Sequence, residues 1–223
     1  MKYKKIILAI GAGIILSSFA QAQTLNWANF TKDDRHIINL NFGYDYAASF
    51  GAAYGYQLKA PVPIVLDAQF SMPAGENLFD DFKSKAGAQV RIFEWKSFCF
   101  SAEAQGIFRR YENPYARLLN FGSEFSGTIG YYRPSWFVAG QAGFDKAIVT
   151  HFKNSELYED NYPRVQNGWY QPATGGNFFY GLQGGYSLRQ ISFYLKAGQV
   201  IEQDFKSSPM IPFYAQLGVN WKL

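Results

Sequence analysis

Apolar and polar residues alternate with period two along most of the chain, most clearly in its last segment. Phe213, Leu217 and Trp221 fall on one face of an extended strand, while Gln216 and Lys222 fall on the other. Nine further segments repeat this alternation, so the sequence predicts ten strands. Their expected ranges are 38–46, 50–58, 64–71, 86–92, 98–108, 119–132, 136–145, 178–188, 191–198 and 213–223.

The connections between these strands fall into two classes that alternate along the chain. Short turns are expected at 59–63, 94–96, 133–135 and 189–190, and longer loops at 73–82, 109–117, 148–175 and 202–212. An antiparallel barrel then carries each class at one end, as outer-membrane barrels do, and only the first outer connection, 47–48, is short. The predicted fold class is all-β, a ten-stranded antiparallel transmembrane β-barrel with eight strands as the fallback, and both termini in the periplasm.

The two faces of the predicted strands differ in charge. The face assigned to the outside has no charge in its middle, whereas the opposite face carries a set of ionisable residues predicted to form a network in the lumen. This set is Asp45, Asp67, Arg91, Glu103, Glu124, Asp145 and Lys196. A water-soluble barrel would turn the apolar faces inward, but so many Phe and Tyr side chains would overfill it. Trp95, Tyr131, Trp136 and Trp221 lie beside short turns or the terminus, where an aromatic girdle is expected.

The first 22 residues have the features of a secretory signal peptide. Lysines precede an apolar run from Ile6 to Phe19, and Ala20-Gln21-Ala22 gives a small-residue cleavage site. A retained anchor is the alternative, but the run is shorter than the ~20 residues that span a bilayer. The predicted division is signal peptide 1–22, a poorly ordered periplasmic lead-in 23–36 and barrel 37–223.

Charge and cysteine content exclude several kinds of function. The leader holds three of the 21 basic residues, which leaves 18 against 17 acidic residues and a mature net charge of +1. This balance gives no electrostatic support for binding nucleic acid. Cys99 is the single cysteine, so no internal disulfide is possible, and His36 and His151 are too far apart to suggest a zinc motif. No cofactor is predicted.

The C-terminal strand carries a short motif with a known counterpart. Gln216, Gly218, Trp221 and Leu223 follow the spacing polar, any, Gly, any, any, hydrophobic, any, hydrophobic. This resembles the C-terminal β-signal of small bacterial outer-membrane β-barrel proteins, although Leu223 stands where an aromatic residue is commoner. The resemblance implies a location in the bacterial outer membrane. It also implies contact with lipid and lipopolysaccharide, and recognition by the barrel-insertion machinery.

Approximate hairpin registers bring Glu103, Glu124 and Asp145 to neighbouring inward positions. Carboxylates this close repel unless one is protonated or paired with a cation. A salt-bridge network with Arg91 and Lys196 would fill a narrow lumen. A lumen that binds cations or conducts protons is the alternative.

The sequence gives weaker support for an enzyme than for a non-enzymatic barrel. Ten-stranded omptin proteases use an Asp pair and an Asp-any-His pair at the barrel mouth, and the candidates here are Asp80, Asp81, Asp145 and His151. Asp145 and His151 are six residues apart rather than two. The His-any-Ser arrangement of lipid A deacylase barrels is not met at 151–153 either, so no enzyme activity is predicted.

The connection 148–175 is long for a small barrel, and such loops are usually functional or mobile. Its aromatic residues Tyr158, Tyr162, Trp169 and Tyr170 suit contact with a partner protein or a surface glycan, or a lid over the mouth. The sequence therefore favours a structural or accessory outer-membrane protein whose outer loops contact a partner. The alternatives are a narrow pore for small polar solutes or ions, and an omptin-like hydrolase.

Overall fold

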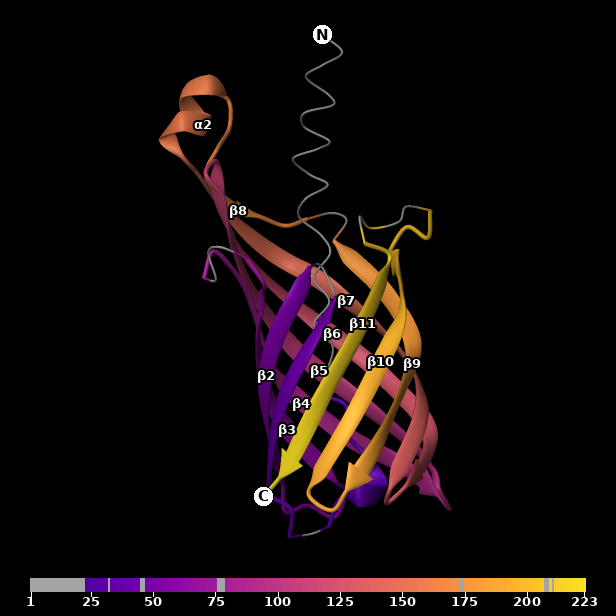
Figure 1. The fold of residues 1–223 in the computed structure, drawn as a ribbon. Helices are drawn as coiled ribbons and strands as arrows, with labels where there is room; N and C mark the ends of the chain where they lie inside the picture. The colour runs from indigo at the N-terminus through magenta and orange to yellow at the C-terminus, as the bar shows by residue number, and fades with distance from the viewer. Residues whose placement is uncertain are drawn as a thin grey trace.

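The computed structural model describes residues 23–31, 33–44, 47–75, 79–172, 175–206, 209 and 211–223. The predicted leader, 1–22, and Asp45 lie outside them. Within them, ten antiparallel strands close into a barrel, and a further short strand pairs at its rim (Figure 1). The barrel strands are β1 (His36–Tyr44), β2 (Ala48–Gln57), β3 (Ile64–Pro73), β4 (Asp81–Trp95), β5 (Phe98–Glu112), β6 (Ala116–Arg133), β7 (Trp136–Asn154), β9 (Gly176–Leu188), β10 (Ile191–Glu202) and β11 (Phe213–Lys222).

Three short elements complete the described part of the chain. They are the 3-10 helix η1 (Trp27–Asn29), the helix α2 (Glu156–Asn161) and the strand β8 (Gly168–Tyr170). Neither of these two helices has the length or the apolar character needed to cross a membrane.

The barrel closes between its first and last strands. β1 pairs with β11 from Ile37 opposite Lys222 to Tyr44 opposite Ala215, and β7 pairs with both β6 and β9. Each barrel strand therefore has a hydrogen-bonded neighbour on both sides, which removes the exposed edge of the sheet. The predicted ten-stranded barrel, and its closure by the C-terminal strand, are confirmed.

The short turns gather at one end of the barrel. We call the end with the turns at 58–63, 96–97, 134–135 and 189–190 the turn end, and the opposite end the loop end. Lys96 and Arg189 adopt positive φ angles of 56° and 53°, the left-handed conformation that two-residue hairpin turns require. The predicted sorting of connections is confirmed except at 113–115, where the β5–β6 loop is as short as a turn.

That exception has a physical cause. Strands β4 to β7 continue at the loop end beyond the predicted limits, so 109–112 and 116–117 belong to strands and not to a loop. In the same way β4 begins at Asp81 and β7 runs to Asn154. The predicted strands stop where the regular alternation of apolar and polar side chains stops, but backbone pairing needs no such alternation once the strand has left the lipid. The extended strands form an arm, carrying α2 and β8, that rises from the barrel in Figure 1.

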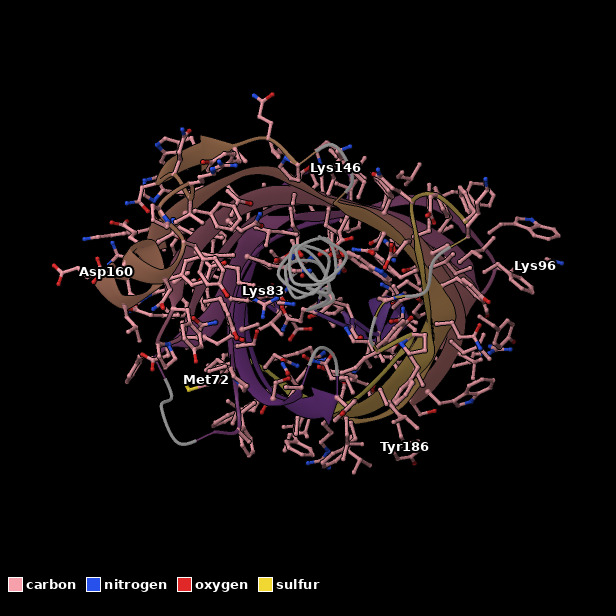
Figure 2. All side chains as sticks on the ribbon, turned by 90° about the horizontal axis from the view of Figure 1, so that it is seen from above. Met72, Lys83, Lys96, Lys146, Asp160 and Tyr186 are labelled. Atoms are coloured by element: carbon pink, nitrogen blue, oxygen red, sulfur yellow. The ribbon has the colours of Figure 1, made fainter. Side chains whose placement is uncertain are left out.

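The outer surface of the barrel is apolar. Large side chains such as Ile129, Leu182 (68% exposed) and Leu217 stand on the outward face at mid-strand. Charged and amide side chains face the interior, as Figure 2 shows for Lys83 inside the ring of strands and Tyr186 outside it. The prediction that apolar faces point outward is confirmed, and the water-soluble alternative is wrong. Trp95, Trp136 and Trp221 are exposed beside the turn end, as an aromatic girdle requires.

A charge placed on this outer face tests its contact with lipid. Leu182→Arg is expected to destabilise the barrel by about 2–4 kcal/mol, the range for arginine at the bilayer midplane. Ile191→Arg, beside the β9–β10 turn, should lower stability by only about 0–1 kcal/mol, the range near the interface. Urea unfolding in lipid vesicles measures both. Equal effects at the two positions would argue against a membrane centred on Leu182.

Candidate functional site

The lumen is closed at the turn end by residues 23–31, which we call the plug. Leu25 and Trp27, each 3% exposed, pack inside the barrel instead of extending away from it. They join a cluster of inward-facing apolar and aromatic residues: Ile37, Val65, Cys99, Tyr132, Phe137, Ala139 and Tyr194. The expectation of a poorly ordered lead-in is therefore wrong for 23–31. The hydrophobic effect holds this segment in the lumen, because the strands offer apolar positions there.

Hydrogen bonds fix the plug to strands around the wall. The Asn220 amide donates to the carbonyl of Thr24 at 2.6 Å, and the Gln89 amide donates to the carbonyl of Gln23 at 2.9 Å. Asn26 caps η1 and donates to Ser187 Oγ at 2.9 Å and to the Arg133 carbonyl at 3.0 Å. These partners come from β4, β6, β9 and β11, so the plug crosses the lumen and does not line one wall.

An ion pair fastens the chain where it leaves the plug. Lys222 Nζ lies 3.0 Å from Asp34 Oδ2 and also donates to the carbonyl of Asn29. Burial acts to raise the pKa of Asp34, but the backbone N–H of Thr31 and the Lys222 ammonium favour the carboxylate. Together they hold the pKa below its ordinary value of 3.8.

The ion pair predicts a pH dependence of stability. Because the folded state depresses the pKa of Asp34, its contribution is complete above pH 3.8 and is lost as the pH falls through the lower folded value. We expect the urea midpoint to drop between pH 5 and pH 2 by less in Asp34→Asn than in the wild type. An identical drop in both proteins would show that this ion pair does not contribute.

The charged pairs that the structure places in the lumen differ from those expected. Lys85 Nζ, not Arg91, lies 2.5 Å from Glu124 Oε2, and both side chains are only 1% exposed. Glu124 and Asp145 are directly opposed on β6 and β7, as predicted, whereas Glu103 is opposite Ser126.

Amides and backbone groups accompany the other carboxylates. Asp67 accepts a hydrogen bond from Gln105 Nε2 at 2.6 Å, and Asp145 accepts from the backbone N–H of Asn177 at 3.1 Å. The Glu103 carboxylate accepts from Ser126 Oγ at 3.3 Å. This arrangement of buried carboxylates, amides and lysines is a polar wall built across adjacent strands.

The sequence prediction omits two cations of the lumen, Lys83 and Lys85, and wrongly includes Arg91. Arg91 lies towards the turn end and pairs with Glu94 at 3.0 Å, a partly exposed contact outside the central network. The bulge between Arg91 and Phe93 shifts the register of β4 with β5 only beyond Arg91. The missed cations are Lys83 and Lys85, which continue the inward face of β4 past its predicted start. The alternation of Lys83 and Lys85 with Phe82 and Ser84 was the signal that could have found them.

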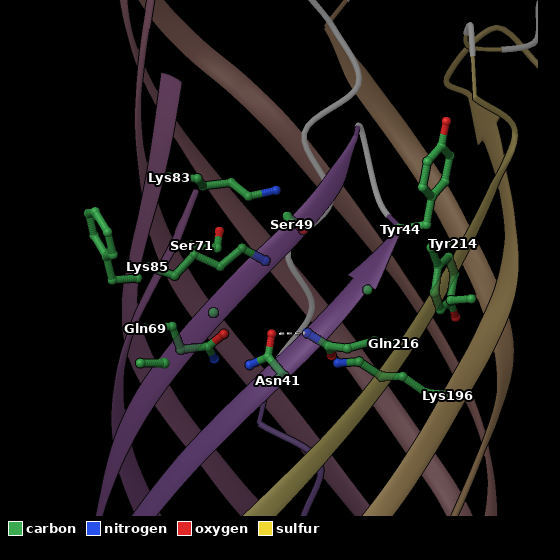
Figure 3. A pocket seen from close by; sticks show the side chains of 15 residues that line it. Asn41, Tyr44, Ser49, Gln69, Ser71, Lys83, Lys85, Lys196, Tyr214 and Gln216 are labelled. Atoms are coloured by element: carbon green, nitrogen blue, oxygen red, sulfur yellow. Dashed lines mark hydrogen bonds between the residues drawn. The ribbon is translucent and has the colours of Figure 1, made fainter. Parts of the chain in front are cut away.

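Towards the loop end the lumen holds a small cavity of about 30 Å³, which we call the vestibule. Lys83, Lys85 and Lys196 reach into it from β4 and β10 (Figure 3). The remaining polar lining consists of hydroxyl and amide side chains: Asn41, Tyr44, Ser49, Gln69, Ser71, Tyr214 and Gln216. Its rim includes Tyr44 and Ser49, on either side of the β1–β2 connection, so the vestibule reaches the loop end.

The β-signal residues divide between the two faces of β11. Gln216 points inward and its amide donates to Asn41 Oδ1 at 2.7 Å, whereas Trp221 and Leu223 are exposed on the outside. Gly218 faces the lumen beneath Tyr194, and a Cβ there would lie 2.4 Å from that ring. Packing against Tyr194 therefore explains the glycine independently of any signal.

The aromatic residues of the long loop gather on the arm. Trp169 packs on His151 with ring centroids 4.8 Å apart, and Tyr170 packs on Phe152 at 5.3 Å. Tyr158 on α2 and Tyr162, the residue that caps the end of α2, pack together with ring centroids 5.0 Å apart. Figures 1 and 2 both place α2 to the side of the barrel, so the arm does not cover the mouth as a lid would.

The residues considered for hydrolysis do not converge. Asp145 is buried in the lumen against Asn177, while His151 lies on the arm against Trp169. Asp81 is held by Arg109 in a two-pronged contact of 2.9 and 3.1 Å. Among the described residues, no three His, Cys, Asp or Glu side chains are grouped to hold a metal ion.

The similar solved structures described below are distant likenesses. No protein family and no curated protein matches the chain. One similar solved structure is described as "KdgM porin in complex with disordered oligogalacturonate", with 8% identity over 84% of this chain and 99% of that chain and a TM-score of 0.39. Another, "Unveiling the Mechanism Behind the in-meso Crystallization of Membrane Proteins", has 9% identity over 85% and 84% and a TM-score of 0.35. At these values neither likeness indicates what this chain does.

Proposed function

We propose that this protein is a non-enzymatic β-barrel of the bacterial outer membrane with a structural or accessory role, and that its lumen is shut at rest. The observation that carries the proposal is the plug. Leu25 and Trp27 occupy the turn end, with hydrogen bonds from the plug to several strands around them. Steady flow of solutes needs a continuous aqueous path, and a dry apolar cluster interrupts it.

The proposal includes an orientation and a set of partners. The turn end, with the plug and the C-terminal strand, faces the periplasm, and the loop end faces outward with lipopolysaccharide around its rim. During biogenesis the barrel-insertion machinery reads Gln216, Gly218, Trp221 and Leu223. The arm then contacts another surface protein or a glycan through Trp169 and Tyr170, which are exposed. Flat amphipathic rings of this kind are common in contact surfaces.

A narrow pore for small polar solutes is the second candidate. The vestibule favours it, because a lumen with no passage function has no evident need for a polar cavity that reaches its rim. The two candidates differ in whether the plug leaves its place.

Conductance in planar lipid bilayers separates them. We expect the wild-type barrel to show no steady current, and a variant lacking residues 24–30 to show a stable open channel. The wild type conducting as well as the deletion variant would overturn the proposal of a shut lumen. Protection of loops from added protease in whole cells would test the orientation, with the arm expected to be cut first.

A further inference from the structure

Paired aromatic side chains mark both edges of the lipid-facing surface on β5 and β6. Near the turn end Phe98 lies opposite Tyr131, with ring centroids 5.3 Å apart. Near the loop end Phe108 lies opposite Phe121, with ring centroids 5.1 Å apart. The two pairs are ten residues apart on each strand, which is about 33 Å along the strand at about 3.3 Å per residue. A strand tilt of about 40° turns this length into about 25 Å, the height of the apolar band of an outer-membrane barrel. The hydrocarbon therefore ends at Phe108 and Phe121 on this side of the barrel.

The loop-end pair is part of a longer row of rings. Phe82 on β4 packs against Phe108 with ring centroids 5.9 Å apart, and Trp169 on β8 packs against Phe121 at 6.0 Å. Trp169 is 60% exposed, and its ring is apolar with one polar N–H. Side chains of this kind gather where the hydrocarbon of a membrane meets the headgroups. The row therefore fixes the level of the headgroups on the arm.

Three basic residues, which we call the basic patch, lie just beyond this row on the same outward face. Arg110 follows Phe108 by two residues on β5, and Arg117 precedes Phe121 by four residues on β6. Lys153 on β7 is directly opposite Arg117, so it shares the face of Arg117. At about 3.3 Å per residue and the same tilt, the patch stands about 5–10 Å beyond the row. Headgroups occupy this depth, because they add about 5–8 Å to each side of the hydrocarbon core.

The chain itself neutralises the basic patch only in part. Arg110 forms an ion pair with Glu112, and these side chains are 31% and 37% exposed. Nε of Arg117 is shielded from solvent, yet it makes no hydrogen bond within the ranges that the structure describes. Such an exception commonly marks a position taken by water, an ion or a ligand. The acidic side chains of α2 stand further out, at the tip of the arm (Figure 1). The surface at headgroup level is therefore positive and carries a donor that lacks an acceptor.

We propose that the outward face of the arm binds the phosphorylated sugar headgroup of lipopolysaccharide in the surrounding leaflet. Arg117 and Lys153 bind the phosphate groups, for which a guanidinium offers two parallel donors. Trp169 packs against a sugar ring at the boundary with the hydrocarbon. The inference rests on the proposed function, because the loop end must face outward for this face to meet lipopolysaccharide. It narrows the surface glycan proposed above to one that is anchored in the same membrane.

Titration of the protein purified in detergent tests the site. Lipopolysaccharide with a short sugar chain is the probe, and phosphatidylglycerol, an anionic phospholipid without sugar phosphates, is the reference. Native mass spectrometry counts the bound lipid. We expect lipopolysaccharide to bind more tightly than phosphatidylglycerol. Arg117→Gln and Lys153→Gln should each weaken its binding about tenfold, the loss typical of one charge-assisted contact. Lys59→Gln, which changes an exposed lysine at the turn end, is the matched control and should leave binding unchanged.

Trp169→Ala keeps all the charges and tests the sugar contact. It should weaken lipopolysaccharide binding by a factor of about two to ten, the range for one aromatic contact, and leave phosphatidylglycerol binding unchanged. An equal affinity for the two lipids would overturn the proposal, because the patch would then attract any anionic lipid. So would binding of lipopolysaccharide to the Arg117 and Lys153 variants that is as tight as to Lys59→Gln.

The proposed function can fail separately from this site. A steady current through the wild-type barrel would refute the shut lumen, and an arm that added protease does not cut in whole cells would refute the orientation. Neither result changes the titration, which measures lipid binding in detergent without conduction and without a cell envelope. Urea midpoints at the wild-type value would show that the variants fold, so that weaker binding reports the site.

Discussion

Trp27→Ala is expected to release the plug and to convert a shut barrel into a conducting one. Trp27 is the largest side chain of the plug and lies in one buried cluster with Ile37 and Val65. Truncating a buried tryptophan to alanine typically destabilises by about 3–5 kcal/mol. The hydrogen bonds that remain contribute only about 0.5–1.5 kcal/mol each. Loss of this one side chain should therefore shift the plug towards an undocked state while the barrel itself stays folded.

Two measurements follow this change. Hydrogen exchange of the backbone amides in 23–31 should become markedly faster, and planar bilayers should show openings that the wild type lacks. Trp169→Ala is the control, because Trp169 is exposed on the arm and far from the lumen. Slow exchange and a silent bilayer in Trp27→Ala would mean that the hydrogen bonds of Asn26 and Asn220 suffice to hold the plug.

The side of the barrel wall to which each side chain points could be predicted. It depends only on whether the residue has an odd or an even position in its strand, which we call its parity. Successive residues in a strand point to opposite sides, so Glu124 must face away from Phe125 whatever the barrel's size. The prediction fails only where parity is interrupted. In β7 the register shifts opposite Phe121 and Gly122, and beyond it Thr150 faces inward with the parity opposite to that of Asp145.

The same reasoning could not predict where the strands end. Nor could it predict the level of each inward side chain along the barrel axis. Apolar alternation marks the part of a strand that meets lipid. In the arm the apolar residues no longer alternate regularly with polar ones, so the sequence predicts loops there. Parity also says nothing about the level of a side chain along the barrel axis. Arg91 and Lys85 have the same parity on β4, yet only Lys85 reaches Glu124.

The sequence contains a feature that points to the plug, although the strand prediction takes no account of it. Ile37, Val65 and Phe137 are apolar residues at inward positions of a lumen that also holds many charged and amide side chains. Such residues need an apolar partner inside the barrel, and Leu25 and Trp27 lie just ahead of β1. Three-dimensional proximity of strands far apart in sequence was required to see that these residues form one cluster.

Breaking the Lys85–Glu124 pair is expected to have the other large effect. Both side chains are almost fully buried and their charged atoms are 2.5 Å apart. Lys85→Met leaves the Glu124 carboxylate without this cation, a change that typically destabilises by about 3–5 kcal/mol. Urea unfolding in lipid vesicles, followed by tryptophan fluorescence, measures the loss. A midpoint unchanged in Lys85→Met would show that other groups already neutralise Glu124.

The double variant Lys85→Met/Glu124→Leu separates the pair from its surroundings. Replacing both partners of a buried ion pair by apolar residues is often neutral, so most of the stability lost in Lys85→Met should return. Glu124→Gln in the barrel lacking residues 24–30 then decides between a structural and a conducting role. A structural pair predicts altered unfolding with unchanged cation current. A current that falls with this substitution instead assigns Glu124 to a cation path, because a neutral amide keeps the shape of the lumen and removes its charge.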